Sequence, residues 1–327
     1  MDANVERLET AHAVERLARA RALGRAASRE AAQALMGLLA DPDQLVRWEA
    51  AEALVELGRR LQQRRILGWS ALFSRAGPFD FDGLIELAAA HLAEAAVDGR
   101  LAMVDVLGGW GHAAGTPWLI QRLEEDQAPV VRAAAARALG TLRDAAALDA
   151  LISSLADDSL WVRRAAAEAL GAIGDPRAAG ALKKALDALD EAAPASGDDA
   201  VTAPPADAQG ELLLRAALVA ALGHLPGARA RGTLMRYVEH PDPELRWRAA
   251  RGLATVGNAS AVPALRALLD DQRAVLGLTV AEVAAASLQT IARNERGLLS
   301  WLRKTLSSAS RLVRRLRRRL PAPDRDD

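Results

Sequence analysis

The sequence predicts an all-α protein, a right-handed solenoid of about eight helical hairpins. The main observation is a motif that returns at a fixed register, a leucine that is usually followed by glycine, at positions 23, 54, 107, 139, 170, 222, 253 and 288. Five of the seven spacings lie between 31 and 35 residues, and the other two (53 and 52) equal one period plus about 20 residues. Self-similarity at such a period is typical of stacked repeats that each pack on their neighbours.

The second observation is an arginine seven residues before seven of the eight leucines. These arginines are Arg16, Arg47, Arg100, Arg132, Arg163, Arg215 and Arg246. Such a row could bind an anion, but each arginine follows a core position and lies close to an acidic turn. We therefore predict a structural role, in which the guanidinium groups bond the carboxylates and carbonyls of adjacent turns and fix the repeat register.

The third observation is helical periodicity around each leucine. In the copies at 131–140 and 162–171, a valine, an alanine pair and the leucine fall at i, i+4/i+5 and i+8, which is one face of a helix. A second apolar stretch precedes each copy, and Asp/Pro-rich turns such as 41–43, 157–158 and 241–243 separate the two. Each unit is thus predicted to be helix A, a tight turn and helix B. Proline near the start of several A helices (Pro117, Pro176, Pro263) fits this assignment.

These repeats resemble the HEAT-repeat family, in particular the short HEAT-like repeats of the phycobilin lyase type. The resemblance covers residues 1–292. The copy ending at 107 departs from the pattern with Met103 and Val104 in place of the alanine pair, and the copy ending at 288 has Ala281 in place of the arginine. The resemblance implies a fold that serves many activities, so it leaves the function open.

Composition narrows the classes of function. The chain has no cysteine, so it has no disulfide, thiolate nucleophile or cysteine-based metal site. The N-terminus lacks the apolar core of a signal peptide, and no apolar run approaches the ~20 residues of a membrane-spanning helix, so we expect a cytoplasmic protein. Residues 298–327 hold nine Lys/Arg and three Asp/Glu, which leaves 33 basic and 39 acidic residues elsewhere. A net acidic array argues against general nucleic-acid binding.

The candidate partner site lies on the B helices, on the side away from the buried stripe. We expect this side to line the concave groove of the array and to bind a protein or peptide, because exposed Trp and Arg are enriched at binding hot spots. The alternative is that the two tryptophans only cover seams between repeats. The candidate residues are Trp48, Glu49, Glu52, Glu56, Arg137, Arg164, Glu168, Trp247, Arg248 and Arg251, with Asp105 and His224 at equivalent positions.

Two insertions interrupt the array. Residues 59–81 begin with a basic, helix-like stretch and hold all three phenylalanines, which favours either an added helix on the edge of the array or a contact with a partner or lipid. Residues 190–210 are rich in Pro, Gly, Ala and Asp with few large apolar side chains, so we predict a mobile acidic loop between the A and B helices of the sixth unit.

Residues 293–320 are predicted to form a basic amphipathic helix, followed by a tail over 321–327. Between 298 and 320 there are eight basic residues and no acid, with the leucines and Trp301 on one arc and most of the basic residues opposite. Three interpretations stay open: a cap on the last repeat, a tether to an anionic membrane surface, or a contact with an acidic protein or nucleic acid. The residues assigned to an anionic surface are Trp301, Arg303, Lys304, Arg311, Arg314, Arg315 and Arg318.

No catalytic or metal-binding residues are predicted, and no cofactor. The five histidines lie at unlike repeat positions and none is followed by Glu, unlike the His-Glu pairs of HEAT-like deoxyhypusine hydroxylases. No phosphate-binding loop or nucleophile motif occurs. We therefore expect a non-catalytic interaction scaffold in the cytoplasm, tethered by its C-terminal helix at the inner face of the membrane. The alternatives are an accessory subunit of a chromophore lyase-like enzyme and a HEAT-like nucleic-acid-binding protein.

Overall fold

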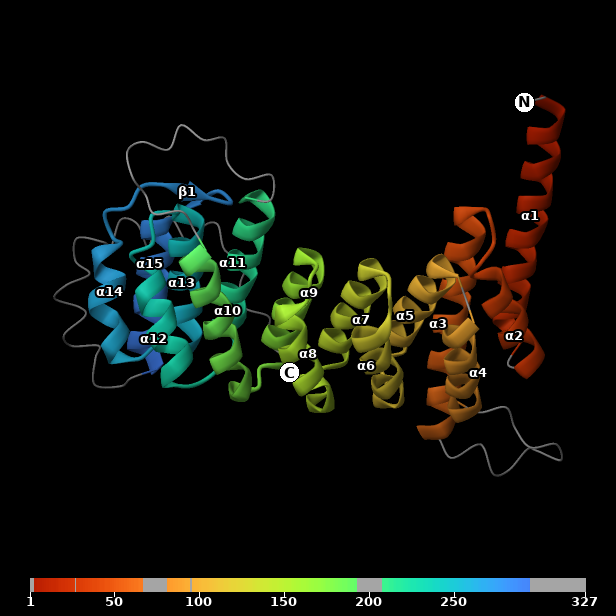
Figure 1. Ribbon diagram of the computed structural model, residues 1–327, viewed down its shortest axis with the longest axis horizontal. Coiled ribbons are helices and arrows are strands. Elements are labelled where there is room, and N and C mark those ends of the chain that lie inside the picture. The colour runs from red at the N-terminus through yellow and green to blue at the C-terminus, as the bar shows by residue number, and fades with distance from the viewer. Residues whose placement is uncertain (1–2, 27, 67–80, 95, 193–207, 295–327) are drawn as a thin grey trace. The chain divides into compact units, whose positions relative to one another are not determined.

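The computed structural model describes residues 3–26, 28–66, 81–94, 96–192 and 208–294. These residues form helices, most of them joined by short turns, together with one two-stranded hairpin (Figure 1). The chain divides into two compact units, Met1–Ser154 and Leu155–Asp327. The fold is the all-α solenoid that the sequence predicts, and each of the eight repeat leucines lies in its own helix, which confirms the copies that end at 107 and 288.

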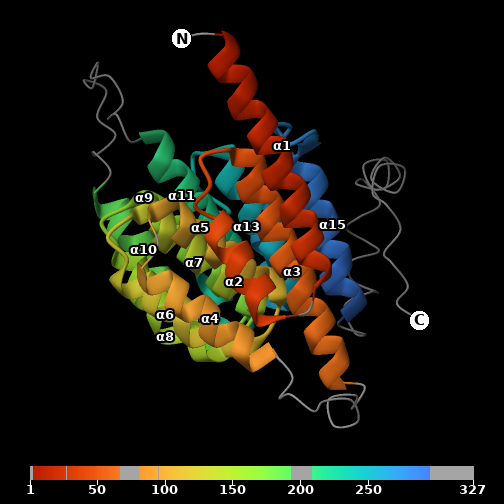
Figure 2. The same ribbon diagram turned by 90° about the vertical axis from the view of Figure 1, so that its right-hand side faces the viewer.

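In the first unit, four B helices pack in sequence order, α1 on α3, α3 on α5 and α5 on α7. The A helices cover one side of this layer, and Figure 2 shows α4, α6 and α8 together beneath α5 and α7. The elements are α1 (Ala3–Arg25), α2 (Arg29–Leu38), α3 (Gln44–Ile66), α4 (Phe81–Glu94), α5 (Val97–Trp110), η2 (Ala113–Gly115), α6 (Thr116–Glu125), α7 (Pro129–Leu142), η3 (Ala145–Ala147) and α8 (Leu148–Ser153), followed by the short turn η4 (Ser154–Ala156).

The second unit repeats the arrangement. Its B helices pack as α9 on α11, α11 on α13 and α13 on α15, and α10, α12 and α14 are its A helices. The elements are α9 (Leu160–Ile173), η5 (Pro176–Ala178), α10 (Ala179–Ala192), α11 (Ala208–Leu222), α12 (Ala228–Tyr237), α13 (Pro243–Val256), η6 (Ala259–Ala261), α14 (Val262–Ala267), β1 (Ala274–Val275), β2 (Leu278–Thr279) and α15 (Val280–Asn294). The strands β1 and β2 pair antiparallel, a hairpin that the sequence analysis did not predict.

The repeated Ala-Leu-Gly sequence has a packing reason. The leucine is buried in every B helix except α1, where Leu23 is half-buried, and the glycine that often follows it lies where the next B helix comes close. A Cβ on Gly24 would lie 2.8 Å from the Cβ of Ala53, and one on Gly171 would lie 2.8 Å from the Cα of Ala221. In each pair the partner is the residue just before the leucine of the next helix, so the motif brings small residues together from neighbouring repeats.

The insertions differ in part from expectation. Residues 59–66 are not a separate added helix, because α3 continues through them to Ile66. This extension is held by the Nε2 of Gln62, which donates to the Trp110 carbonyl at 2.9 Å, and by Arg60, which donates to the Gly24 carbonyl. Near the insertion predicted at 190–210, α10 ends at Ala192 and α11 begins at Ala208. Residues 67–80, 193–207 and 295–327 lie outside the described residues, and with them most of the predicted C-terminal helix.

Candidate interaction surface

Most of the arginines that lie seven residues before the repeat leucines bond the turns between helices, and we call this arrangement the arginine–aspartate ladder. Arg16 of α1 forms a bidentate pair with the carboxylate of Asp41 in the turn before α3, at 2.7 and 3.0 Å. The backbone N–H of Asp43 donates to that carboxylate, and Arg47 of α3 donates to the Asp41 carbonyl at 2.7 Å. One aspartate therefore joins the arginines of two successive repeats.

The same arrangement recurs between α5 and α7. Arg100 pairs with Asp126 at 2.7 and 2.8 Å, the N–H of Ala128 donates to the Asp126 carboxylate, and Arg132 donates to the Asp126 carbonyl at 3.0 Å. The side chain of Asp126 is 1% exposed. Burial acts to raise the pKa of this carboxyl, but the hydrogen bonds from Arg100 and Ala128 outweigh burial and the pKa is lowered. The pKa values of Asp41 and Asp271 are lowered in the same way.

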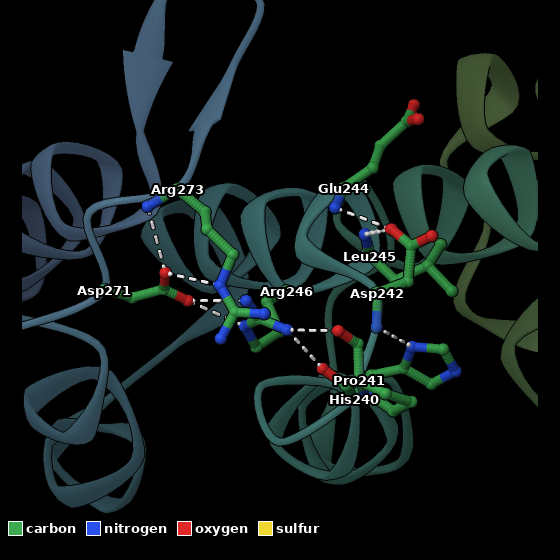
Figure 3. Close-up of polar contacts among 8 residues, drawn as sticks. All are labelled: His240, Pro241, Asp242, Glu244, Leu245, Arg246, Asp271 and Arg273. Carbon is green, nitrogen blue, oxygen red and sulfur yellow. Dashed lines mark hydrogen bonds and ion pairs between the residues drawn. The ribbon is translucent and has the colours of Figure 1, made fainter.

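In the second unit, Arg246 of α13 makes the carboxylate and carbonyl contacts of the ladder, as Figure 3 shows. Arg246 donates to the carboxylate of Asp271 at 2.7 and 2.8 Å and to the carbonyls of His240 and Pro241 at 2.7 Å. His240 holds the position that Asp41 and Asp126 hold elsewhere, and its Nδ1 accepts from the N–H of Asp242 at 3.0 Å. Burial lowers the pKa of His240, which keeps this nitrogen available as an acceptor.

At the remaining positions of the ladder, the contacts differ from those of Arg16, Arg100 and Arg246. In the last repeat, where Ala281 replaces the arginine, the backbone N–H of Ala281 donates to the Asp271 carbonyl at 3.0 Å. Arg215 bonds backwards, to the Leu189 carbonyl and to Asp190. The Nε of Arg163 is buried without a hydrogen-bond partner among the described residues. The structural role predicted for the arginines is confirmed by these contacts at six of the seven positions.

The position two residues before the ladder arginine holds an apolar residue in five of the seven repeats, a recurrence that the sequence analysis missed, and it holds Asp98 and Glu244 in the other two. In the first unit this position holds Val14, Leu45 and Val130, which are 65%, 67% and 48% exposed. In the second unit it holds Leu213, which is partly exposed, and Trp161, which is 70% exposed and has the guanidinium of Arg164 5.7 Å from its ring centre. The signal was present in the sequence, because an apolar residue recurs at one register outside the buried stripe.

In the first unit, the predicted site residues gather on α3. Trp48 is 60% exposed and lies one turn after Leu45 on the same face of the helix. Glu52 and Glu56 follow Trp48 at intervals of four residues and are also exposed, whereas Glu49 is bound by Arg21 of α1 at 3.0 Å. Arg137 is exposed on α7. The structure thus places an exposed aromatic–aliphatic pair beside carboxylates.

In the second unit, the predicted residues form local pairs along single helices. Arg164 and Glu168 of α9 bond each other at 3.0 Å, and Arg248 of α13 bonds Glu244 at 2.6 Å. Arg251 is exposed on α13, and its guanidinium lies 5.4 Å from the ring centre of Trp247.

The exposure predicted for Trp247 is wrong. This residue occupies the same repeat position as Trp48, one after the ladder arginine, but it is only 5% exposed. Arg251 stacks on it from one turn further along α13, and its Nε1 is buried without a hydrogen-bond partner among the described residues. Trp247 is therefore a packing residue of the second unit, and the two tryptophans do not form an exposed pair.

The residues assigned to an anionic surface, from Trp301 to Arg318, lie outside the described residues. Among the helices that are described, none is both long and apolar enough to cross a membrane. Within the same part of the chain, no cluster of three or more His, Asp or Glu side chains has the arrangement of a metal site.

An array of helical hairpins joined by a repeated turn defines an α-helical repeat protein. The family model for HEAT repeats matches residues 1–65, 84–160, 116–193 and 209–281. The chain therefore belongs to the HEAT-repeat family, as the sequence resemblance predicts.

Solved structures give a looser likeness. The complex of CpcE and CpcF of phycocyanin lyase from Nostoc sp. PCC7120 is 28% identical, with 64% of this chain and 77% of that chain covered and a TM-score of 0.47. Human deoxyhypusine hydroxylase is 22% identical, with 88% and 93% covered and a TM-score of 0.34. An engineered protein is 19% identical, with 90% and 92% covered and a TM-score of 0.40. No curated protein matches the chain.

Proposed function

We propose that this chain is a non-catalytic protein-interaction scaffold that holds a protein or peptide partner on the exposed face of its B helices. The observation that carries the proposal is the pair Leu45 and Trp48, two large apolar side chains more than half exposed on one face of α3. An exposed aromatic anchor beside an aliphatic one, with charged neighbours, is the usual composition of a binding hot spot.

The partner-binding residues are assigned unit by unit. In the first unit they are Trp48, Glu49, Glu52, Glu56 and Arg137, with Leu45 added from the structure. In the second unit they are Arg164, Glu168, Arg248 and Arg251, with Trp161 added. Trp247 has only a supporting role, because it is buried beneath Arg251.

Quantitative co-purification with the tagged full-length chain tests the scaffold role. We expect a double substitution, Leu45→Ala with Trp48→Ala, to deplete the proteins that co-purify with the wild type, since both side chains lie on the surface. Trp118→Ala is the matched control, because Trp118 is 37% exposed on the A helix α6 of the same unit. Unchanged co-purification with the double variant, or equal depletion with the control, would contradict the assignment of the site to α3.

We also propose that residues 298–320 tether the scaffold to an anionic membrane at the cytoplasmic face. The support is their sequence alone, eight basic residues without an acid on a leucine-rich stretch. We expect the full chain to float with anionic liposomes and not with neutral ones, and Arg314→Gln, Arg315→Gln and Arg318→Gln together to reduce flotation. Equal flotation of this triple variant, or none of the wild type, would rule the tether out.

A further inference from the structure

The face formed by α3 and its neighbour α5 combines apolar and acidic side chains. On α3, Trp48, Glu52 and Glu56 follow one another at intervals of four residues, which places them along one stripe of the helix. The two helices are in close contact, because a Cβ on Gly109 of α5 would lie 2.9 Å from the side chain of Val55 of α3.

Helix α5 continues the acidic character in the matching register. Asp98 and Asp105 come 53 residues after Leu45 and Glu52, the same interval that separates the repeat leucines of the two helices. Both aspartates are exposed on α5. Because α3 and α5 pack side by side in repeat register, Asp105 is the counterpart of Glu52 on the neighbouring helix. The α3–α5 face therefore consists of Leu45, Trp48, Glu52, Asp98 and Asp105.

The carboxylates of this face are poorly neutralised by the chain itself. Glu49 is bound by Arg21, but neither Glu52 nor Asp98 has an ion pair with any of the residues that the structure describes. Arg60 approaches Glu56 only to 3.7 Å, at the far end of the stripe.

Asp105 adds a second observation. Burial raises the pKa of this carboxyl, against a weaker opposite effect of the Arg137 charge, although the side chain is still reached by solvent. A carboxylate that is partly desolvated and not directly paired gains most from a cation supplied from outside.

We propose that the α3–α5 face binds a basic amphipathic segment of a partner protein. Leu45 and Trp48 contact the apolar side of that segment. Glu52, Asp98 and Asp105 form ion pairs with its lysines and arginines. This inference rests on the scaffold function proposed above and specifies the chemistry of its partner. An acidic peptide or a nucleic acid is disfavoured at the same place, because its negative charges would meet unneutralised carboxylates.

Fluorescence anisotropy on the full-length chain tests the inference with a defined probe. The probe is a rhodamine-labelled 15-residue peptide of leucine and lysine with leucines at helical spacing, about 22 Å long as a helix. The same peptide with glutamate in place of lysine is the charge control. We expect the lysine peptide to bind and the glutamate peptide not to bind. Raising the salt concentration from about 50 to about 500 mM should weaken binding, since the exposed charges become screened.

Two matched sets of variants locate the binding. Trp48→Ala should weaken binding of the lysine peptide by about tenfold or more. Glu52→Gln with Asp98→Asn should weaken it several-fold and flatten the salt dependence. Trp118→Ala and Glu124→Gln with Glu125→Gln, all exposed positions of α6, should leave it unchanged.

Equal binding of the two peptides, equal loss with the α6 variants, or no binding of the lysine peptide at about 1 mM would overturn the inference. The scaffold role itself is read out separately, by the dependence of co-purifying proteins on Leu45 and Trp48. If that dependence holds while the peptide results fail, the partner has a different chemistry. If both fail, the α3–α5 face is not a binding site.

Discussion

At the scale of single residues, the ladder explains why the arginine recurs seven residues before the leucine. In the complete rungs, the guanidinium bonds a carboxylate about 25 residues further along the chain, as in Arg16–Asp41 and Arg246–Asp271. The arginine and its contacts with acidic turns were predicted from the register, but the particular aspartate that each arginine bonds was not. It lies in the turn of the next repeat, and His240 or a backbone amide can take over its contacts.

We expect Asp126 to contribute more to the stability of the fold than an exposed ion pair does. In the Asp126→Asn variant the amide can still accept from Ala128, but the buried charge that faces Arg100 is lost. We expect a loss of about 2–3 kcal/mol in the free energy of unfolding, measured by urea denaturation. The matched control is Glu168→Gln, whose partner Arg164 lies in the same helix at an exposed position, with an expected loss below about 0.5 kcal/mol. Equal losses would show that the ladder is no more than a surface ion pair.

We expect the stabilisation that the ladder aspartates provide to be lost in acid. The pKa values of Asp41, Asp126 and Asp271 are lower in the folded chain than the value of about 3.9 expected when it is unfolded. The unfolded state therefore takes up protons first, so the stabilisation is present above about pH 4 and is lost as the pH falls through the lower folded values. Urea midpoints between pH 6 and pH 3 should fall in the wild type and fall less steeply in Asp126→Asn. Parallel curves would mean that Asp126 does not titrate as described.

The two tryptophans at the same repeat position should behave oppositely. Trp247→Ala removes a buried ring and should lower the free energy of unfolding by about 3–5 kcal/mol. Trp48→Ala should change it by no more than about 0.5 kcal/mol, because its ring is exposed. A large loss of stability with Trp48→Ala would show that this ring is part of the core and not an exposed anchor.

At the scale of helices, the glycine after the repeat leucine sets how closely successive B helices pack. The tightest example joins α11 and α13, where a Cβ on Gly223 would lie 2.7 Å from the Cα of Gly252. Backbone meets backbone at this contact, so relief by movement of a flexible side chain is not possible there.

Gly252→Ala should therefore destabilise the protein although alanine favours helices. We expect a loss of about 1–3 kcal/mol from the forced separation of α11 and α13. Gly232→Ala is the matched control within a helix, because a Cβ on Gly232 of α12 would meet nothing within 4 Å, and it should stabilise the protein by up to about 1 kcal/mol. The midpoint temperatures of thermal unfolding of the two variants test this prediction. A shift of both midpoints in the same direction would contradict the close-packing role.

Much of the fold was predictable from the sequence because the repeat carries several independent signals. The leucine register, the alanine-rich faces and the Asp/Pro turns all specify B helices, and the eight predicted copies are all helical. The extension of α3 to Ile66 was not predicted, because its contacts with Trp110 and Gly24 come from other repeats. The burial of Trp247 was missed for a similar reason. Its repeat position alone does not show that the side chain of Arg251 lies over the ring.

At the scale of the whole molecule, repetition separates the residues that build the fold from those that are free to bind. The buried leucines, the small residues and the ladder arginines recur in nearly every unit, whereas most exposed positions, such as that of Trp48, vary from one repeat to the next. Leu45 and Trp48 stand out on α3 because they are apolar at positions where packing does not require it. The central claim is that this variation makes the face of α3 a binding site for a protein partner.

Site-specific photo-crosslinking in living cells tests this claim most directly. The photoreactive residue benzoylphenylalanine would replace Trp48, and in a control Trp118, each in the full-length chain. We expect a covalent adduct of discrete mass for position 48 that disappears when Leu45→Asp is added, with no such adduct for position 118. Equal adducts at both positions, or none at position 48, would contradict it.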